Sequence, residues 1–179
     1  MEGDRTGALF QKVAAALLVG ALGTLSSVSS EDLARAASKH DLLEKQTLEL
    51  INRDRLAPEF FSETRGRARP LLWDDRLAAV ARAHSEEMVR NAYFGHDAAN
   101  GASPGERILS AGIPWARVGE NIASCQSITQ AESTFMDEPK FERNHRWNIL
   151  NPDYTRLGVG IAKGSDGMLY ITEDFVRLR

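Results

Sequence analysis

The chain has 179 residues, enough for one domain of ordinary size and a short appendage. Hydrophobic residues make up 42% and charged residues 26%, as in soluble globular proteins, and the formal net charge is −3. Basic residues are scattered among acidic ones, which argues against nucleic-acid binding. The single cysteine, Cys125, excludes a disulfide within the chain and a cysteine-rich zinc site, and we interpret it as a buried structural thiol.

The N-terminus has the order of a secretory signal peptide, which we place over residues 1–30. Basic residues precede an apolar run over residues 13–22, and small and polar residues follow. Because this run is shorter than the roughly 20 residues of a membrane span, we expect cleaved export to the periplasm, the cell envelope or the medium. Residues 27–29 and residues 34–36 both fit a cleavage site. The alternatives are an uncleaved segment that anchors the protein to the membrane and an amphipathic start of a cytosolic protein.

Residues 31–40 are polar and rich in alanine, and we interpret them as a linker outside the fold. From residue 41 the pattern becomes helical, so we place a single domain over residues 41–179. Leucine and isoleucine recur among charged residues over residues 41–57, which predicts the first helix. The stretch 59–70 contains glycine and several charges, a composition typical of a loop.

Three further helices are indicated by their N-caps. Asp74 caps the clearest one, in which apolar residues recur at three- and four-residue steps over residues 77–88. A capping box at residues 103–106, with proline at the first helical position, begins a short helix that Gly112 ends. The same pattern at residues 127–130 begins another helix.

Strands are predicted mainly towards the C-terminus. Residues 118–123 form a short predicted strand, and apolar residues alternate with glycine over residues 157–161. A turn at residues 164–167 leads into a last strand over residues 169–175, which completes a β-hairpin. Helices segregated from antiparallel strands indicate an α+β domain. We expect these side chains to be buried between helices and sheet: Trp73, Leu77, Val80, Met88, Ile122, Val159, Ile161 and Ile171.

Histidine and glutamate are the remaining candidates for chemistry, because no GxSxG elbow, HExxH, phosphate-binding loop or dinucleotide fingerprint occurs. His84 falls on the apolar face of its helix and is interpreted as a hydrogen-bonded core histidine. His96 follows that helix, and Glu120 lies in a predicted strand, where a buried carboxylate needs a partner. His145 begins a largely apolar segment. Two neutral imidazoles and a carboxylate are a workable ligand set for zinc or a similar divalent ion.

Five short motifs follow one another along about three-quarters of the chain. They are Asn52-Arg53-Asp54-Arg55 with Leu72-Trp73-Asp74; Ala83-His84 to Met88 with Phe94-Gly95-His96; Gly119-Glu120-Asn121-Ile122; His145-Arg146-Trp147-Asn148-Ile149-Leu150-Asn151-Pro152; and Gly158-Val159-Gly160. In this order they resemble the CAP superfamily (cysteine-rich secretory, antigen 5 and pathogenesis-related proteins), specifically its cysteine-poor bacterial branch. The resemblance implies a three-layer α-β-α sandwich with an antiparallel sheet and a cleft lined by two histidines and two acids.

The resemblance also implies which residues line that cleft. His96 and His145 match its two histidines, and Glu120 matches the acid of the Gly-Glu-Asn motif. Glu138 matches the second acid, and Glu142 is the alternative, because the segment before the second histidine is longer here than is usual in bacterial members. We therefore predict a ligand-binding set of His96, Glu120, Glu138 and His145, with the two histidines as metal ligands.

Family membership leaves open whether the protein is an enzyme, since one fold supports many functions. The hypothesis that we favour is an exported binding module, whose cleft takes a divalent metal such as zinc, a small molecule, a peptide or a cell-envelope ligand. The alternative is a metal-assisted, peptidase-like hydrolase in which a glutamate activates water. A third interpretation gives the same side chains a purely structural role as a hydrogen-bond network. We expect no nucleic-acid partner, and membrane contact only through an uncleaved N-terminal segment.

Overall fold

The computed structural model describes the backbone of residues 30–179 and the side chains from residue 39 onward. The signal peptide predicted over residues 1–30 therefore lies, apart from Ser30, outside the described residues. The first helix, α1 (Ser30–Leu56), includes the backbone of the stretch 31–40 that we interpreted as a linker. Alanine, leucine and lysine have high helix propensity, so a polar, alanine-rich composition does not distinguish a linker from the start of a helix.

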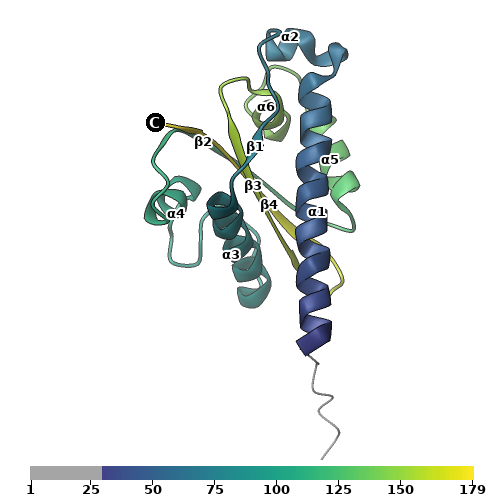
Figure 1. The fold of residues 1–179 in the computed structure, drawn as a ribbon, viewed down its shortest axis with the longest axis vertical. Helices are drawn as coiled ribbons and strands as arrows, with labels where there is room; N and C mark the ends of the chain where they lie inside the picture. The colour runs from purple at the N-terminus through teal and green to yellow at the C-terminus, as the bar shows by residue number, and fades with distance from the viewer. Residues whose placement is uncertain (1–29) are drawn as a thin grey trace, which may run out of the picture. The chain divides into compact units, whose positions relative to one another are not determined.

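Four strands form one sheet in the order β1-β3-β4-β2 (Figure 1). They are β1 (Leu72–Trp73), β2 (Trp115–Cys125), β3 (Arg156–Lys163) and β4 (Leu169–Leu178). The predicted hairpin is present, and β4 pairs antiparallel with both β3 and β2. Only the two-residue β1, which the sequence pattern did not indicate, runs parallel to its neighbour β3. Because β2 stands last in the strand order, it is an edge strand of the sheet.

The remaining helices are α2 (Phe61–Thr64), α3 (Asp75–Asn91), α4 (Pro104–Ser110), α5 (Ile128–Met136) and α6 (His145–Leu150), with a 3-10 turn at Pro58–Phe60. Of these, α3, α4 and α5 begin at the caps that the sequence predicts. Oδ1 of Asp74 accepts from the backbone N–H groups of residues 76 and 77, and the capping box before α4 is complete. Within residues 59–70, where we expected only a loop, Pro58 begins a helical turn that continues into α2. No helix in the described part of the chain is long and apolar enough to cross a membrane.

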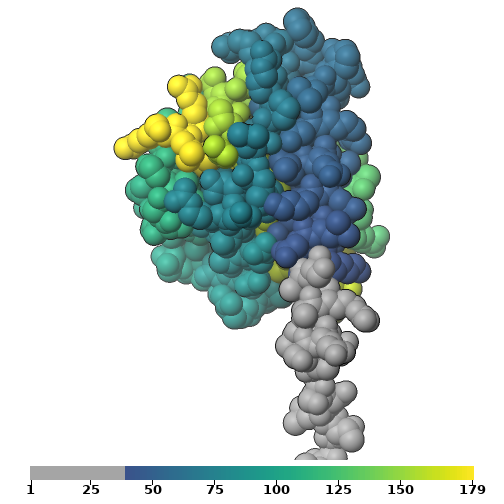
Figure 2. Space-filling model, in the orientation of Figure 1, coloured from purple at the N-terminus to yellow at the C-terminus, as the bar shows by residue number. Residues whose placement is uncertain are grey.

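The two faces of the sheet carry separate hydrophobic clusters, which confirms the three-layer arrangement. One cluster joins α1, α5 and α6 to the inward-facing residues Leu157, Val159 and Phe175. The other joins α3 and α4 to Val176, which points the opposite way from its neighbour Phe175 because side chains alternate along a strand. In Figure 1, α3 and α4 lie on the left of the sheet and α1 and α5 on the right. From this side, α1, α3 and residues 58–70 cover most of the strands (Figure 2).

Six of the eight predicted core side chains are buried. Trp73 and Val80 are only partly buried, and Trp73 Nε1 donates to Oδ1 of Asp75 at 2.7 Å. The other six predicted side chains are at most 6% exposed. Helix α3 lies directly against β3, because Gly158 and Gly160 present no side chain to it. The glycines that alternate with apolar residues in β3 are therefore required by close packing.

We expect Gly160→Ala to destabilise the domain strongly, because the new Cβ would overlap the backbone of Ala81 and Arg82 in α3. Overpacking of this kind costs about 3 kcal/mol at the upper end of its usual range. The matched control is Gly95→Ala, since a Cβ there meets nothing within 4 Å, and we expect a change of about 0.5 kcal/mol or less. Denaturant unfolding of both variants measures the difference, and equal stability would show that α3 does not pack on β3 in this way.

Candidate functional site

A cleft of about 730 Å³ lies beside the edge strand β2, which α4, α5 and α6 all contact. All four predicted site residues line it, although they come from four separate segments of the chain. Its walls are formed by His96, Trp115, Arg117, Val118, Glu120, Glu138, Arg143, Asn144, His145, Trp147, Asn148 and Tyr154. The alternative acid, Glu142, is exposed and is not among them. The geometry thus brings Glu138 and not Glu142 to the cleft.

The first half of the site is built around the buried carboxylate of Glu120 in β2. Its side chain is 2% exposed, and both oxygens have cationic or hydrogen-bonding partners. Nδ1 of His96 lies 2.8 Å from Oε1, and the guanidinium of Arg107 in α4 donates to Oε2. Arg107 also donates to the backbone oxygen of His96 at 2.6 Å. One arginine therefore holds both the carboxylate and the loop that carries the histidine.

Asp174 faces Glu120 across the β2–β4 ladder and is fully buried. Burial raises the pKa of the Asp174 carboxyl well above its ordinary value, and the negative charge of Glu120 raises it further. Burial and the neighbouring carboxylate thus both favour the neutral form of Asp174.

The second half of the site fixes His145 at the first position of α6. Oε1 of Glu138 lies 2.5 Å from Nδ1 of His145, and Oε2 accepts from the backbone N–H of the same residue at 2.8 Å. The helix N-terminus attracts a carboxylate, so this position is favourable for Glu138. The imidazole ring also stacks on Phe135 of α5, with 4.5 Å between ring centroids. Both the position and the orientation of the ring are thereby fixed.

The two histidines share one arrangement. Each donates through Nδ1 to a glutamate, and among the described residues neither Nε2 atom has a hydrogen-bond partner. Nε2 is thus the nitrogen that remains available to a ligand in the cleft. In the described part of the chain, no group of three or more His, Cys, Asp and Glu side chains lies close enough to hold a metal ion. A metal here would rest on the two imidazoles alone, and the roles of the four residues in binding stay predictions.

His96 is the more basic of the histidines whose pKa is shifted. The hydrogen bond to Glu120 raises the pKa of His96 above its ordinary value, although burial and the charge of Arg107 act against it. His84 behaves in the opposite way, since burial lowers its pKa. Its Nε2 donates to the backbone oxygen of Gly95 at 3.0 Å, as expected of a core histidine. His84 therefore supports the loop that carries His96.

Sequence analysis missed the residues that position this site. Arg107 gave no signal, because it is one of several scattered basic residues and its partner Glu120 lies in another element. Asn148 donates through Nδ2 to the backbone oxygen of Glu120 at 3.2 Å, so α6 is tied to β2. Tyr154 donates through its hydroxyl to the backbone oxygen of Val118 at 3.1 Å. The thiol of Cys125 is buried and its pKa is raised by that burial, in agreement with a structural role.

The family model of the Cysteine-rich secretory protein family (CAP) matches residues 48–175, a range that includes all four site residues. The chain belongs to the CAP family. The resemblance of its five motifs is thereby confirmed, together with the α-β-α sandwich that the resemblance implies.

Relatives of this CAP domain are longer than the chain itself. The uncharacterized protein YkwD of Bacillus subtilis (strain 168) is 34% identical over 129 residues, 72% of this chain and 46% of YkwD. The uncharacterized membrane protein YlbC of the same strain is 33% identical over 140 residues, 75% of this chain and 34% of YlbC. An extracellular protein containing a SCP domain from Bacillus anthracis str. Ames superposes with a TM-score of 0.64 and 27% identity, over 83% of this chain and 44% of that one. The chain thus spans less than half the length of these three proteins.

We expect the imidazole of His96 to titrate above the usual histidine value of about 6.5, and Glu120→Gln to lower that pKa, because the accepting carboxylate is lost. His84 should titrate below the same value. A pH titration followed by NMR on imidazole carbon-bound protons resolves the rings, with Glu142→Gln as the control outside the cleft. A His96 pKa that is the same in the wild type and in Glu120→Gln would contradict the pairing.

Proposed function

We propose that this CAP domain is an exported binding module, whose cleft holds a divalent metal ion such as zinc together with a small or peptide ligand. The observation that carries the proposal is the shared arrangement of His96 and His145. Each ring is oriented by a carboxylate at Nδ1, each residue lines the cleft, and Nε2 has no hydrogen-bond partner among the described residues. Metal-binding histidines commonly donate their second ring nitrogen to a carboxylate in this way, which fixes the tautomer and increases ligand basicity.

The two imidazole nitrogens suit a metal ion that is intermediate between hard and soft, such as zinc. Neutral imidazole is a common zinc ligand, and two protein ligands leave coordination positions for water or for a ligand's own donor atoms. A bound ion would supply an attraction for carboxylate or carbonyl oxygens. The surrounding walls would contact the rest of the ligand through the aromatic rings of Trp115, Trp147 and Tyr154. Arg117 and Arg143 add positive charge to the same walls.

Binding is favoured over hydrolysis by the state of the cleft's carboxylates. A general base needs a lone pair that faces the substrate or a water molecule. Both oxygens of Glu120 are engaged by Arg107 and His96, and both oxygens of Glu138 are engaged by His145 and the backbone of α6. The lining also contains no serine, threonine or cysteine that could act as a nucleophile. Metal-assisted hydrolysis therefore remains the second hypothesis.

A location outside the cytoplasm is part of the proposal. It is supported by the basic, apolar and small-residue order of the N-terminal segment. It is also supported by the similarity to the Bacillus anthracis protein, which is described as extracellular. The absence of a disulfide within the chain means that the exported domain relies on its hydrophobic core for stability.

We expect the full chain to bind zinc in isothermal titration calorimetry, and His96→Ala and His145→Ala each to remove most of the affinity. The matched control is His40→Ala, which removes an imidazole in α1, outside the cleft. Because protons compete for neutral imidazole, affinity should fall as the pH is lowered, beginning above pH 6.5 for His96, whose pKa is raised. Thermal melts of each variant without zinc report on stability.

A purely structural role for the same residues predicts a different pair of results. The wild type would then show no measurable zinc affinity at about pH 7.5, where imidazole is mostly neutral. His145→Ala would also melt early, since Glu138 would lose its partner. That combination would overturn the metal-binding proposal.

A further inference from the structure

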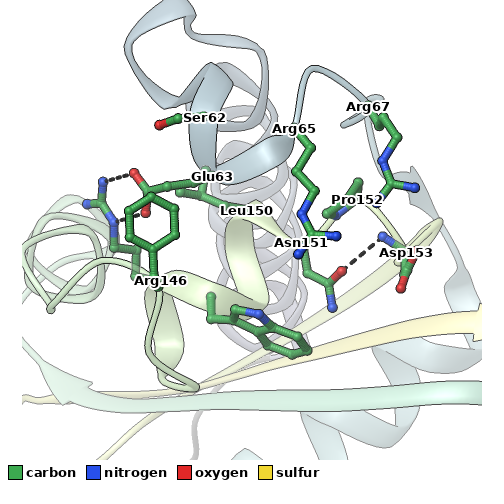
Figure 3. Close-up of a pocket in the computed structure, with 11 residues that line it drawn as sticks. Ser62, Glu63, Arg65, Arg67, Arg146, Leu150, Asn151, Pro152 and Asp153 are labelled. Carbon is green, nitrogen blue, oxygen red and sulfur yellow. Dashed lines mark hydrogen bonds and ion pairs between the residues drawn. The ribbon is translucent and has the colours of Figure 1, made fainter.

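A second pocket shares the lining residue Trp147 with the cleft. Its volume is about 330 Å³, and its walls come from α2, the turn after it, α6 and residues 151–153 (Figure 3). It contains neither of the two cleft histidines. Its size is at the lower end of the usual range for small-molecule sites. The pocket is therefore a separate candidate for ligand binding.

The pocket is lined by three arginines and two acidic residues, and both acids are already paired. Arg146 is paired with Glu63 through two contacts of 2.7 Å, and both side chains are almost fully buried. Asp153 is paired with Arg117, which lies outside the pocket, at 3.3 Å.

Arg65 and Arg67 differ from these lining residues. Among the described residues, neither guanidinium has an ion pair or a hydrogen-bond partner, and both side chains are exposed. Figure 3 shows both extending from the turn after α2 towards residues 151–153 on the opposite wall. Two guanidinium groups are thus available to an anion.

The opposite wall presents an unsatisfied hydrogen-bond donor. Asn151 is 6% exposed, and its Oδ1 accepts from the backbone N–H of Asp153 at 3.0 Å. Its Nδ2 is buried and has no partner among the described residues. Because this nitrogen has almost no accessible surface, a ligand in the pocket would meet the two exposed guanidinium groups instead. These two groups favour a ligand with negatively charged oxygens.

The remaining lining adds an apolar surface and a strained backbone. Phe141 is 72% exposed and has a φ of 64°, which is rare for a bulky aromatic residue. Arg65 also has a left-handed backbone, with a φ of 54°, at a helix C-cap where glycine is usual. These two residues and Ala92 are the only non-glycine residues with positive φ in the described part of the chain. Two of the three thus line one pocket.

We infer that this pocket binds an organic anion. Its carboxylate or phosphate would lie between the guanidinium groups of Arg65 and Arg67, and its apolar or aromatic part would rest on Phe141 and Trp147. Planar guanidinium groups recognise the oxygens of both kinds of anion. The site goes beyond the metal cleft, since it requires neither His96 nor His145.

The test uses three probes on the full chain, freed of metal beforehand and exchanged into buffer without chelator: N-acetylphenylalanine, phenyl phosphate and the neutral N-acetylphenylalanine amide. Two-dimensional amide NMR follows the titrations. We expect at least one of the two anions to shift the signals of residues 62–67 and 150–153, and the neutral amide to bind at least about tenfold more weakly. The ratio of the two anion affinities distinguishes a carboxylate site from a phosphate site.

Single substitutions locate the anion. Arg65→Gln and Arg67→Gln should each weaken binding about fivefold or more, because each removes a charge-assisted contact. Arg69→Gln removes the same charge from the same turn but lies outside the pocket, so it should leave the affinity unchanged. His96→Ala should also leave it unchanged, which separates this site from the metal cleft.

Three results would overturn the inference. One is the absence of binding of both anions up to about 10 mM, a concentration well above weak millimolar affinities. Another is anion binding that survives both Arg65→Gln and Arg67→Gln. The third is anion binding that is lost in His96→Ala, because the anion would then belong to the cleft. Failure of zinc binding alone would leave the pocket unaffected.

Discussion

A buried carboxylate on an edge strand is the constraint that determines the cleft. An isolated negative charge is expensive to remove from water, so Glu120, with its side chain 2% exposed, requires partners on both oxygens. Arg107 brings α4 to the strand, and His96 brings the loop that follows α3. Removing one partner would leave the charge uncompensated, which is more costly than the pair itself is stabilising. The position of His96 therefore follows from the need to pair the buried carboxylate of Glu120.

The edge of the sheet explains why two histidines from different layers can meet in one cleft. His96 is held on the face that α3 and α4 cover, while His145 belongs to α6 in the layer on the other face. Only beside a strand without a further neighbour can residues from both layers approach each other. Asn148 stabilises this arrangement, because its side chain in α6 donates a hydrogen bond to the backbone oxygen of Glu120. The cleft is thus a consequence of the strand order as much as of its side chains.

The parts of this structure that were predictable from sequence are those with local causes. Asp74 caps α3 through its own neighbours, and the alternation of Gly158 and Gly160 with apolar residues is visible in the chain itself. By contrast, Arg55 donates to backbone oxygens of residues 69, 149, 151 and 154, so its role depends on contacts far apart in sequence. The same holds for Arg107. His96, Glu120 and His145 were candidates by residue type, but their place in one cleft was predicted from motifs that resemble a family in a fixed order. Glu138 could be separated from Glu142 only by geometry.

The central claim is that His96 and His145 both carry their proton on Nδ1 and offer Nε2 to a metal. Long-range proton–nitrogen NMR of the imidazole rings, recorded at about pH 8, reports the tautomer of each neutral ring directly. We predict the Nδ1–H tautomer at both residues, and a shift of both Nε2 resonances on addition of one equivalent of zinc, with Nδ1 still protonated. An Nε2–H tautomer at either ring, or Nε2 resonances that zinc leaves in place, would contradict the account.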